Sequence, residues 1–151
     1  GEVEFQGHAF EKEEDFQFFQ GRAFDCIFLC DVFLYYFESY KPMDLTPSQL
    51  LSQLCGLLKP QGRIYICDPH GCFQLQSWFG RASPYLISTE YKHRRFRVTP
   101  TLEEVSLAVE AAGMTIKKIR ECYCQEDLER DNQNASVAKE FPLWWFFEIG
   151  K

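Results

Sequence analysis

The sequence lacks a long hydrophobic run, since no stretch approaches the roughly 18 apolar residues that a membrane-spanning helix needs. No signal peptide or internal repeat is visible. Positive charge is scarce, with 16 Lys and Arg against 22 Asp and Glu and a net charge of -6. We therefore expect a cytoplasmic protein with no membrane partner. The acidic balance also argues against a nucleic acid as its main partner, because phosphate binding needs a basic face.

An even set of cysteines, which would suggest a disulfide framework, is absent too. The chain has 7 cysteines, and this odd count predicts reduced thiols in a cytosolic protein. Two pairs have the spacing of residues on the same face of a strand, so we expect buried, small hydrophobic side chains there. These pairs are Cys26 with Cys30 and Cys122 with Cys124.

Hydrophobic and aromatic side chains, by contrast, are abundant. Hydrophobic residues make up 46% of the sequence and aromatic residues 17%, including 15 Phe. This composition favours a well-packed core or an aromatic pocket over a disordered chain. The length of 151 residues predicts a single domain that spans residues 1–151.

Two apolar strands that each end at an acidic residue form the central pattern of the sequence. Residues 24–30 lead to Asp31, and residues 63–67 lead to Asp68. A helix pattern and a Pro/Gly turn lie between them, which is typical of a β-α-β unit with parallel strands. Because parallel sheets are covered on both faces, we expect residues 24–30 to be buried on both sides. Ligands bind open α/β sheets at the carboxyl ends of the strands, so this edge is the predicted small-molecule site.

The first long helix pattern has clear start and stop signals. Thr46 is the predicted N-cap, followed by Pro47 and by leucines that repeat on one helical face up to Leu58. The turn at residues 59–62 is expected to end this helix before the second strand begins.

A second helix pattern follows Thr101, which forms a capping-box sequence with Glu104. Gly113 is the predicted left-handed residue after this helix. Strands are predicted at residues 114–121 and 143–149, with a polar loop over 125–139. The expected inward face of the helix consists of Leu102, Val105, Ala108, Val109 and Ala112.

In this order, the segments resemble the later half of a class I S-adenosylmethionine-dependent methyltransferase. The turn Leu-Leu-Lys-Pro-Gln-Gly is similar to the family's L-L-K-P-G-G turn into its fifth strand. The resemblance implies a Rossmann-like three-layer α/β sandwich with parallel strands and an antiparallel carboxyl-terminal strand. It also implies S-adenosylmethionine as cofactor. The matching segments, from the family's third strand to its seventh, are residues 3–9, 24–32, 57–63, 99–120 and 141–149.

Two parts of the family pattern are absent: the glycine-rich first loop (G-x-G-x-G) and the acidic end of the second strand. Both would precede Gly1, so we expect an amino-terminally truncated chain. In the family's strand order, 3-2-1-4-5-7-6, this truncation leaves residues 24–30 at an edge of the sheet. An apolar edge strand promotes aggregation or dimerisation, so this edge is the candidate surface for a homodimer. We also expect residues 3–6 to stray from the family position or to be poorly held.

The resemblance implies cofactor-binding residues in two places. His8 and Ala9 correspond to the turn beside the adenine, and Cys30, Asp31 and Val32 to the end of the fourth strand. His8 stands where the family usually has an acidic residue, and a neutral imidazole is not an equivalent acceptor for the adenine amino group. The alternative for Asp31 is that its side chain caps the following helix.

Further candidate side chains follow the two strands, and each has an alternative role that is purely structural. Tyr35, with Tyr36, could make a cation–π contact with the cofactor's sulfonium, worth about 0.5–2 kcal/mol, or could simply pack. His70 is the candidate catalytic residue, a general base for an oxygen nucleophile, or part of a polar turn at the pocket rim. Asp68, His70 and Cys72 are close in sequence, but metal sites need three or four well-spaced ligands, so we expect no metal.

The function implied by the resemblance is methyl transfer from S-adenosylmethionine to a small-molecule acceptor. Residues 70–98 correspond to a substrate-covering insertion, and the basic residues within 92–97 either bind an anionic substrate or form a solvated face. The Asp-Pro-Pro-Tyr pattern of methyltransferases that act on nucleic-acid amines is absent, which argues against a base-flipping enzyme. Two alternatives stay open: a non-catalytic methyltransferase-like interaction module that docks through its edge strand, and a nicotinamide-binding Rossmann half, which the antiparallel aromatic ending fits less well.

Overall fold

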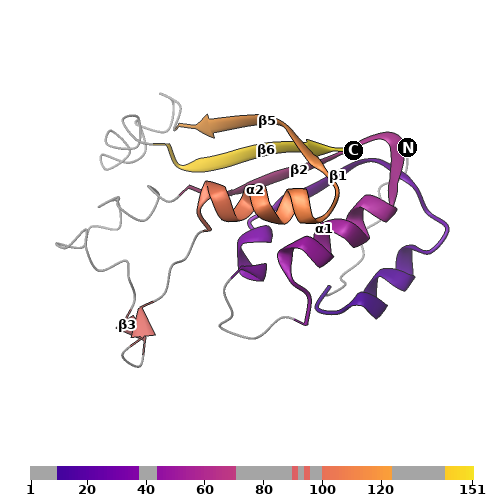
Figure 1. The fold of residues 1–151 in the computed structure, drawn as a ribbon, viewed down its shortest axis with the longest axis horizontal. Coiled ribbons are helices and arrows are strands. Elements are labelled where there is room, and N and C mark those ends of the chain that lie inside the picture. Colours follow the sequence, from indigo (N-terminus) through magenta and orange to yellow (C-terminus); the bar gives the residue numbers. More distant parts are fainter. Residues whose placement is uncertain (1–9, 38–43, 71–89, 92–93, 96–99, 124–141) are drawn as a thin grey trace, which may run out of the picture.

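A four-stranded sheet with helices packed against it forms the fold in the computed structural model (Figure 1). The structure describes residues 10–37, 44–70, 90–91, 94–95, 100–123 and 142–151. The strands lie in the order β1-β2-β6-β5, and residues 90–91 and 94–95 form a separate small hairpin, β3 with β4. The strands of the main sheet are β1 (Phe24–Cys30), β2 (Leu58–Pro69), β5 (Thr115–Cys122) and β6 (Trp144–Gly150).

The strand directions confirm the Rossmann-like α/β fold expected from the sequence. β1 pairs with β2 in parallel, whereas β6 is antiparallel both to β2 and to β5. The last strand is therefore inserted antiparallel between two strands that run in the same direction. The crossover from β1 to β2 contains α1 (Pro47–Gly56), as a parallel connection requires. β1 lies at one edge of the described sheet, as expected for the strand at residues 24–30.

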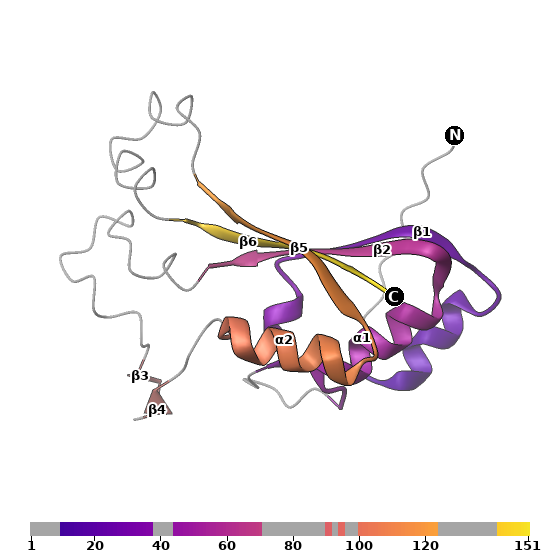
Figure 2. The same cartoon turned by 45° about the horizontal axis from the view of Figure 1, so that its top comes forward.

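All described helices lie on one face of the sheet, as Figure 2 shows most clearly. Between the helices and the sheet lies the core, in which Ile64 and Ile66 of β2 are fully buried. On the opposite face of the sheet Phe28 is 64% exposed. The expectation that residues 24–30 are buried on both sides is therefore wrong for the described part of the chain, because no described element covers this face. The helices are η1 (Glu13–Phe19), η2 (Phe33–Tyr36), α1 and α2 (Leu102–Ala111).

The capping box predicted at Thr101 is present, and the predicted N-cap Thr46 also forms a capping box, with Gln49. The side chains of Thr46 and Thr101 accept the amides of Gln49 and Glu104 at the starts of α1 and α2. Gly113 has a φ of 69°, as predicted for the residue that follows a helix in the left-handed region. Leu102 is 41% exposed, so its predicted place on the inward face is wrong. Leu102 is the first residue of α2, and the buried residues of this helix are Val105, Ala108 and Val109.

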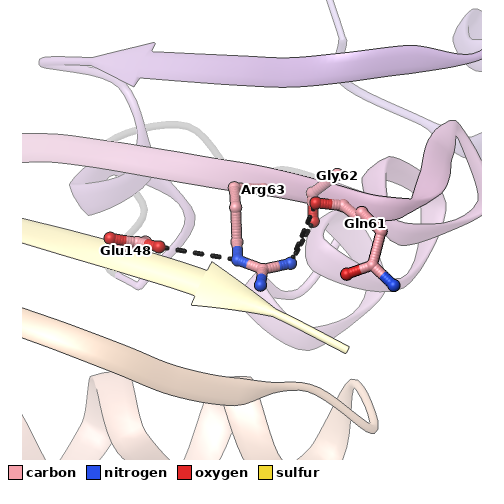
Figure 3. A network of polar contacts seen from close by, with 4 residues as sticks. All are labelled: Gln61, Gly62, Arg63 and Glu148. Atoms are coloured by element: carbon pink, nitrogen blue, oxygen red, sulfur yellow. Dashed lines mark hydrogen bonds and ion pairs between the residues drawn. The ribbon is translucent and has the colours of Figure 1, made fainter.

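The Pro/Gly turn lies inside β2 rather than before it. Strand β2 begins at Leu58, and its pairing with β1 shifts register between Phe24 and Cys26. Beyond the turn, the Arg63 side chain extends between β2 and β6 (Figure 3): its Nη1 donates to the carbonyls of Gln61 and Gly62, both at 3.0 Å. Its Nε lies 3.5 Å from Glu148 of β6, so the side chain joins the turn to the last strand.

Several predictions lie outside the described residues. These are the strand at residues 3–6, the loop at 125–139 and most of the proposed insertion at 70–98. No helix in the described ranges is long and apolar enough to cross a membrane.

Candidate functional site

The candidate site lies where β1 and β2 end side by side. Cys30 and Cys67 are paired residues of these parallel strands. One residue later, the Asp31 N–H donates to the Cys67 carbonyl at 2.9 Å, which extends the pairing to the end of β1. Asp31 then turns the chain sharply with a φ of 59°. Aspartate is one of the few non-glycine residues that tolerate this left-handed conformation.

A carboxylate from β2 holds the turn that Asp31 begins. Asp68 is 4% exposed, and its Oδ1 accepts the Val32 N–H at 3.1 Å. Val32 is the N-cap residue of η2 and makes no side-chain cap of its own. The alternative in which the Asp31 side chain caps the following helix is thus wrong, because Asp68, 36 residues further along the chain, supplies the acceptor.

Burial changes the acidity of this carboxylate. The pKa of Asp68 is raised from 3.8 to about 6, mainly by desolvation and to a smaller extent by the nearby Asp31 charge. The backbone amides of Val32, Leu34 and Phe33 act in the opposite direction. Its buried Oδ2 has no hydrogen-bond partner among the described residues. The candidate site therefore contains a buried carboxyl group whose pKa lies near 6.

The turn presents its side chains to solvent. Asp31 and Cys30 are exposed, Val32 is 41% exposed, and Tyr35 is 52% exposed. Tyr36 takes the packing role instead: it is buried, and its hydroxyl donates to the Phe10 carbonyl at 2.6 Å. The four exposed residues thus form an accessible rim at the carboxyl end of β1.

His70 lies one step beyond the end of β2 and is 8% exposed. Its backbone N–H donates to the Leu143 carbonyl at 2.8 Å, and the centroid of its imidazole ring lies 4.1 Å from that of the Trp145 ring. Nε2 lies 3.4 Å from a carboxylate oxygen of Glu121. Burial lowers the pKa of His70, and Glu121 only partly opposes this effect, so the imidazole is neutral near pH 7.

The structure brings together some of the predicted site residues. Cys30, Asp31, Val32 and Tyr35 form one continuous segment, whereas His70 packs against β5 and β6. His8 and Ala9 lie outside the described residues. In the described ranges, no group of three or more His, Cys, Asp or Glu residues could hold a metal ion.

The role of Asp68 in holding the turn after β1 was not predicted from the sequence. Its position at the end of an apolar strand was visible, but its partner Val32 follows only from the register of β1 against β2.

An apolar groove of about 280 Å³ runs beside β1 on its outer edge. It is bounded by side chains of η1, β1, η2 and α1, and six of its 13 lining residues are aromatic. Among the residues that line it are Phe16, Phe19, Phe24, Phe28, Tyr36 and Leu54.

Comparison with solved structures identifies the fold. No family model matches the chain, and no curated protein matches its sequence. The chain is similar to an S-adenosylmethionine-dependent methyltransferase from Mesorhizobium loti, with a TM-score of 0.57 and 14% identity over 85% of this chain. The fold is that of the class I methyltransferases.

The chain covers 62% of the length of the Mesorhizobium loti methyltransferase. It is also similar to the mitomycin 7-O-methyltransferase MmcR, at 12% identity and a TM-score of 0.49, over 86% of this chain and 30% of that protein. In the methyltransferase fold, the ends of β1 and β2 form the edge of the sheet at which open α/β proteins bind their ligands.

Proposed function

We propose that this chain is the carboxyl-terminal portion of a methyltransferase domain that transfers a methyl group from S-adenosylmethionine to a small-molecule acceptor. The observation that carries the proposal is the exposed rim of the candidate site. In a methyltransferase-like fold, Asp31 and Val32 turn away from the paired ends of β1 and β2, and their side chains face solvent.

The residues of the rim fit the chemistry of such a cofactor. Asp31 offers a carboxylate, Tyr35 a half-exposed aromatic ring, and Cys30 and Val32 an apolar surface. These groups suit a ligand that carries both a sulfonium charge and an apolar face. When bound, the cofactor supplies an already activated methyl group, so the protein has mainly to align the acceptor with it. The sequence resemblance adds His8 and Ala9 to the proposed cofactor residues.

His70 is the proposed general base. A neutral imidazole can take a proton from an acceptor hydroxyl, and the adjacent Glu121 carboxylate can stabilise the imidazolium that forms. We propose that residues 70–98 cover the acceptor and set its identity. The 5 free cysteines in the described ranges support a reducing, cytoplasmic location.

Calorimetric titration tests the proposal. The complete polypeptide that contains residues 1–151 is titrated with S-adenosylmethionine and with its demethylated product. We expect both to bind, and Asp31→Asn to weaken binding by about tenfold, which corresponds to ~1.4 kcal/mol. Asp25→Asn is the matched control, because Asp25 is an exposed residue at the other end of the same strand, paired with Lys59.

Absence of binding by either compound would remove the enzymatic proposal and leave a non-catalytic methyltransferase-like module. Residues 1–151 alone should bind weakly or not at all, because the glycine-rich loop is absent from this sequence. Micromolar affinity for the isolated chain would contradict the view that it holds only part of the pocket.

A further inference from the structure

Two thiol groups lie side by side at the carboxyl ends of β1 and β2. Cys30 and Cys67 are register partners in this parallel pair of strands. Paired residues point to the same face of a sheet, and Cys30 is two residues beyond the exposed Phe28, so both thiols lie on the face opposite the helices. Cys30 is exposed and Cys67 is half-buried. The burial expected from the sequence for Cys26 and Cys30 is wrong, because Cys26 is exposed as well.

The pairing of these two residues suits a disulfide bond. Neighbouring strands lie about 4.7–4.9 Å apart, and the two Cα atoms of a disulfide are about 4.4–6.8 Å apart. Electrostatics also indicate that the thiols are close, because burial and then the charge of Cys30 raise the pKa of Cys67. The charge of Cys122 acts in the same direction, but β6 separates its strand from β2, which is too far for a bond. Cys26 pairs with Arg63 instead of a cysteine.

We propose that Cys30 and Cys67 are a redox modification site, at which oxidised glutathione converts the two thiols into a reversible disulfide that weakens cofactor binding. The Cys30 thiolate attacks one sulfur of glutathione disulfide, forms a mixed disulfide and releases one glutathione thiolate. Cys67 then loses its proton and attacks the Cys30 sulfur, which releases the second glutathione. The two protein thiols lose two electrons, and one glutathione disulfide is reduced to two glutathione molecules.

The surroundings of the two cysteines give them different parts in this exchange. Cys30 is exposed, so it is the first to meet a reagent in solvent. Cys67 is half-buried, and its raised pKa keeps it protonated while Cys30 carries a charge. In the mixed disulfide the Cys30 sulfur is neutral, so one of the charges that oppose ionisation of Cys67 is removed. The charges of Asp68 and Asp31, which also raise this pKa, remain.

A disulfide at this place would alter the candidate site, because each cysteine adjoins one of its aspartates. Cys30 directly precedes Asp31, whose left-handed φ begins the exposed rim. Cys67 directly precedes Asp68, which accepts the Val32 N–H. The Cβ atoms of a disulfide are about 3.5–4.5 Å apart, which is less than the strand spacing, so the bond draws the ends of β1 and β2 together. Strained and exposed disulfides are easily reduced, which makes this one reversible.

The first experiment maps the bond in the complete polypeptide that contains residues 1–151, and it does not depend on cofactor binding. Native protein is equilibrated with glutathione disulfide, the remaining thiols are blocked with N-ethylmaleimide, and the unreduced digest is sequenced by mass spectrometry. We expect a link between Cys30 and Cys67 that an excess of reduced glutathione removes. Cys26, exposed on the same face of the same strand, is the internal control and should form no link within the chain. The absence of the link, a link from Cys30 to another cysteine, or a link that survives reduced glutathione would overturn the proposal.

The second experiment measures the effect of the bond on the cofactor, and this part of the inference rests on the proposed function. The reduced and the oxidised polypeptide are titrated with S-adenosylmethionine, and we expect the oxidised form to bind about tenfold more weakly. In Cys67→Ser, treatment with glutathione disulfide should no longer weaken binding, whereas Cys26→Ser should respond as the wild type does.

Two negative results of the titration have different meanings. Equal binding by the reduced and the oxidised wild type would overturn the effect of the bond on the cofactor. Absence of binding by the reduced protein would refute the proposed function, and with it this effect. A mapped link between Cys30 and Cys67 would in either case still establish the modification site, because the mapping needs no cofactor.

Discussion

Asp68 and Val32 are 36 residues apart in sequence, yet the Asp68 carboxylate accepts the Val32 N–H at 3.1 Å. This hydrogen bond joins the end of β2 to the start of η2, whose residues Phe33 and Leu34 are buried. The exposed rim at Asp31 is thus fixed by a buried group on the neighbouring strand. The shape of the candidate site and the stability of the fold depend on the same carboxylate.

We expect Asp68→Ala to lower the free energy of unfolding by about 1–3 kcal/mol, because the Val32 amide would lose its acceptor in a buried place. Asp68→Asn is the matched variant, since its amide oxygen can still accept this hydrogen bond. At pH 7, Asp68→Asn should lower the free energy of unfolding by less than Asp68→Ala does. Urea unfolding of residues 1–151 measures both. If the two variants lost equal stability, the hydrogen bond to Val32 would not be the reason.

The pH dependence of stability should carry opposite contributions from two residues. The pKa of Asp68 is raised to about 6 in the folded protein, so the folded state binds this proton more tightly than the unfolded state does. Asp68 therefore adds to the free energy of unfolding below about pH 4, and this stabilisation is lost as the pH rises to about 6. It amounts to at most about 3 kcal/mol. The pKa of His70 is lowered, so its contribution is present at neutral pH and is lost as the pH falls below 6.5.

Urea titrations at pH 7, 6 and 5 separate these contributions. Asp68→Asn should make the loss of stability on acidification steeper, because it removes the group that favours the folded state at low pH. His70→Gln should make the loss shallower. If either variant followed the wild-type curve in parallel, the ionisation of that residue would not be coupled to folding.

Most helices and strands of the described fold could be predicted from the sequence because their signals are local, whereas the strand order followed from the family resemblance. The apolar strands, the helix caps at Thr46 and Thr101, and the glycine at position 113 each carry their own propensity, and the structure confirms them. The exposed face of β1 could not be predicted in this way, because an apolar strand looks the same whether or not something covers it. The cap of η2 by Asp68 depends on strand register, which the sequence of either strand alone does not determine.

The cap at Thr101 gives a prediction for α2. Its hydroxyl accepts the Glu104 N–H at 3.2 Å, and its own N–H donates to the Glu104 carboxylate at 2.8 Å. Thr101→Ala should cost about 0.5–2 kcal/mol of stability, because the first turn of the helix would lose an acceptor for its free amides. Ser106→Ala, at an exposed position within the same helix, should be neutral or slightly stabilising. Thermal unfolding followed by circular dichroism tests the pair, and equal effects would show that capping does not limit α2.

Gly62 gives the sharpest test of the turn inside β2. A Cβ added there would lie 2.9 Å from the Phe24 carbonyl oxygen, 3.0 Å from a methyl carbon of Leu58 and 3.1 Å from the Lys59 carbonyl oxygen. Two of these three atoms belong to the backbone and cannot move without disturbing the pairing of β2 with β1. We therefore expect Gly62→Ala to destabilise residues 1–151 by about 1–3 kcal/mol.

Gly56 is the matched control for this substitution. It ends α1, and a Cβ at its position meets no atom within 4 Å. Gly56→Ala should leave stability unchanged or raise it by about 0.4–1 kcal/mol, because alanine restricts the unfolded chain more than glycine does. Urea unfolding of both variants distinguishes a steric requirement for glycine at the turn from a general preference for flexible chain. Equal losses of stability at the two positions would mean that the close approach of the Phe24 carbonyl does not explain the need for glycine at position 62.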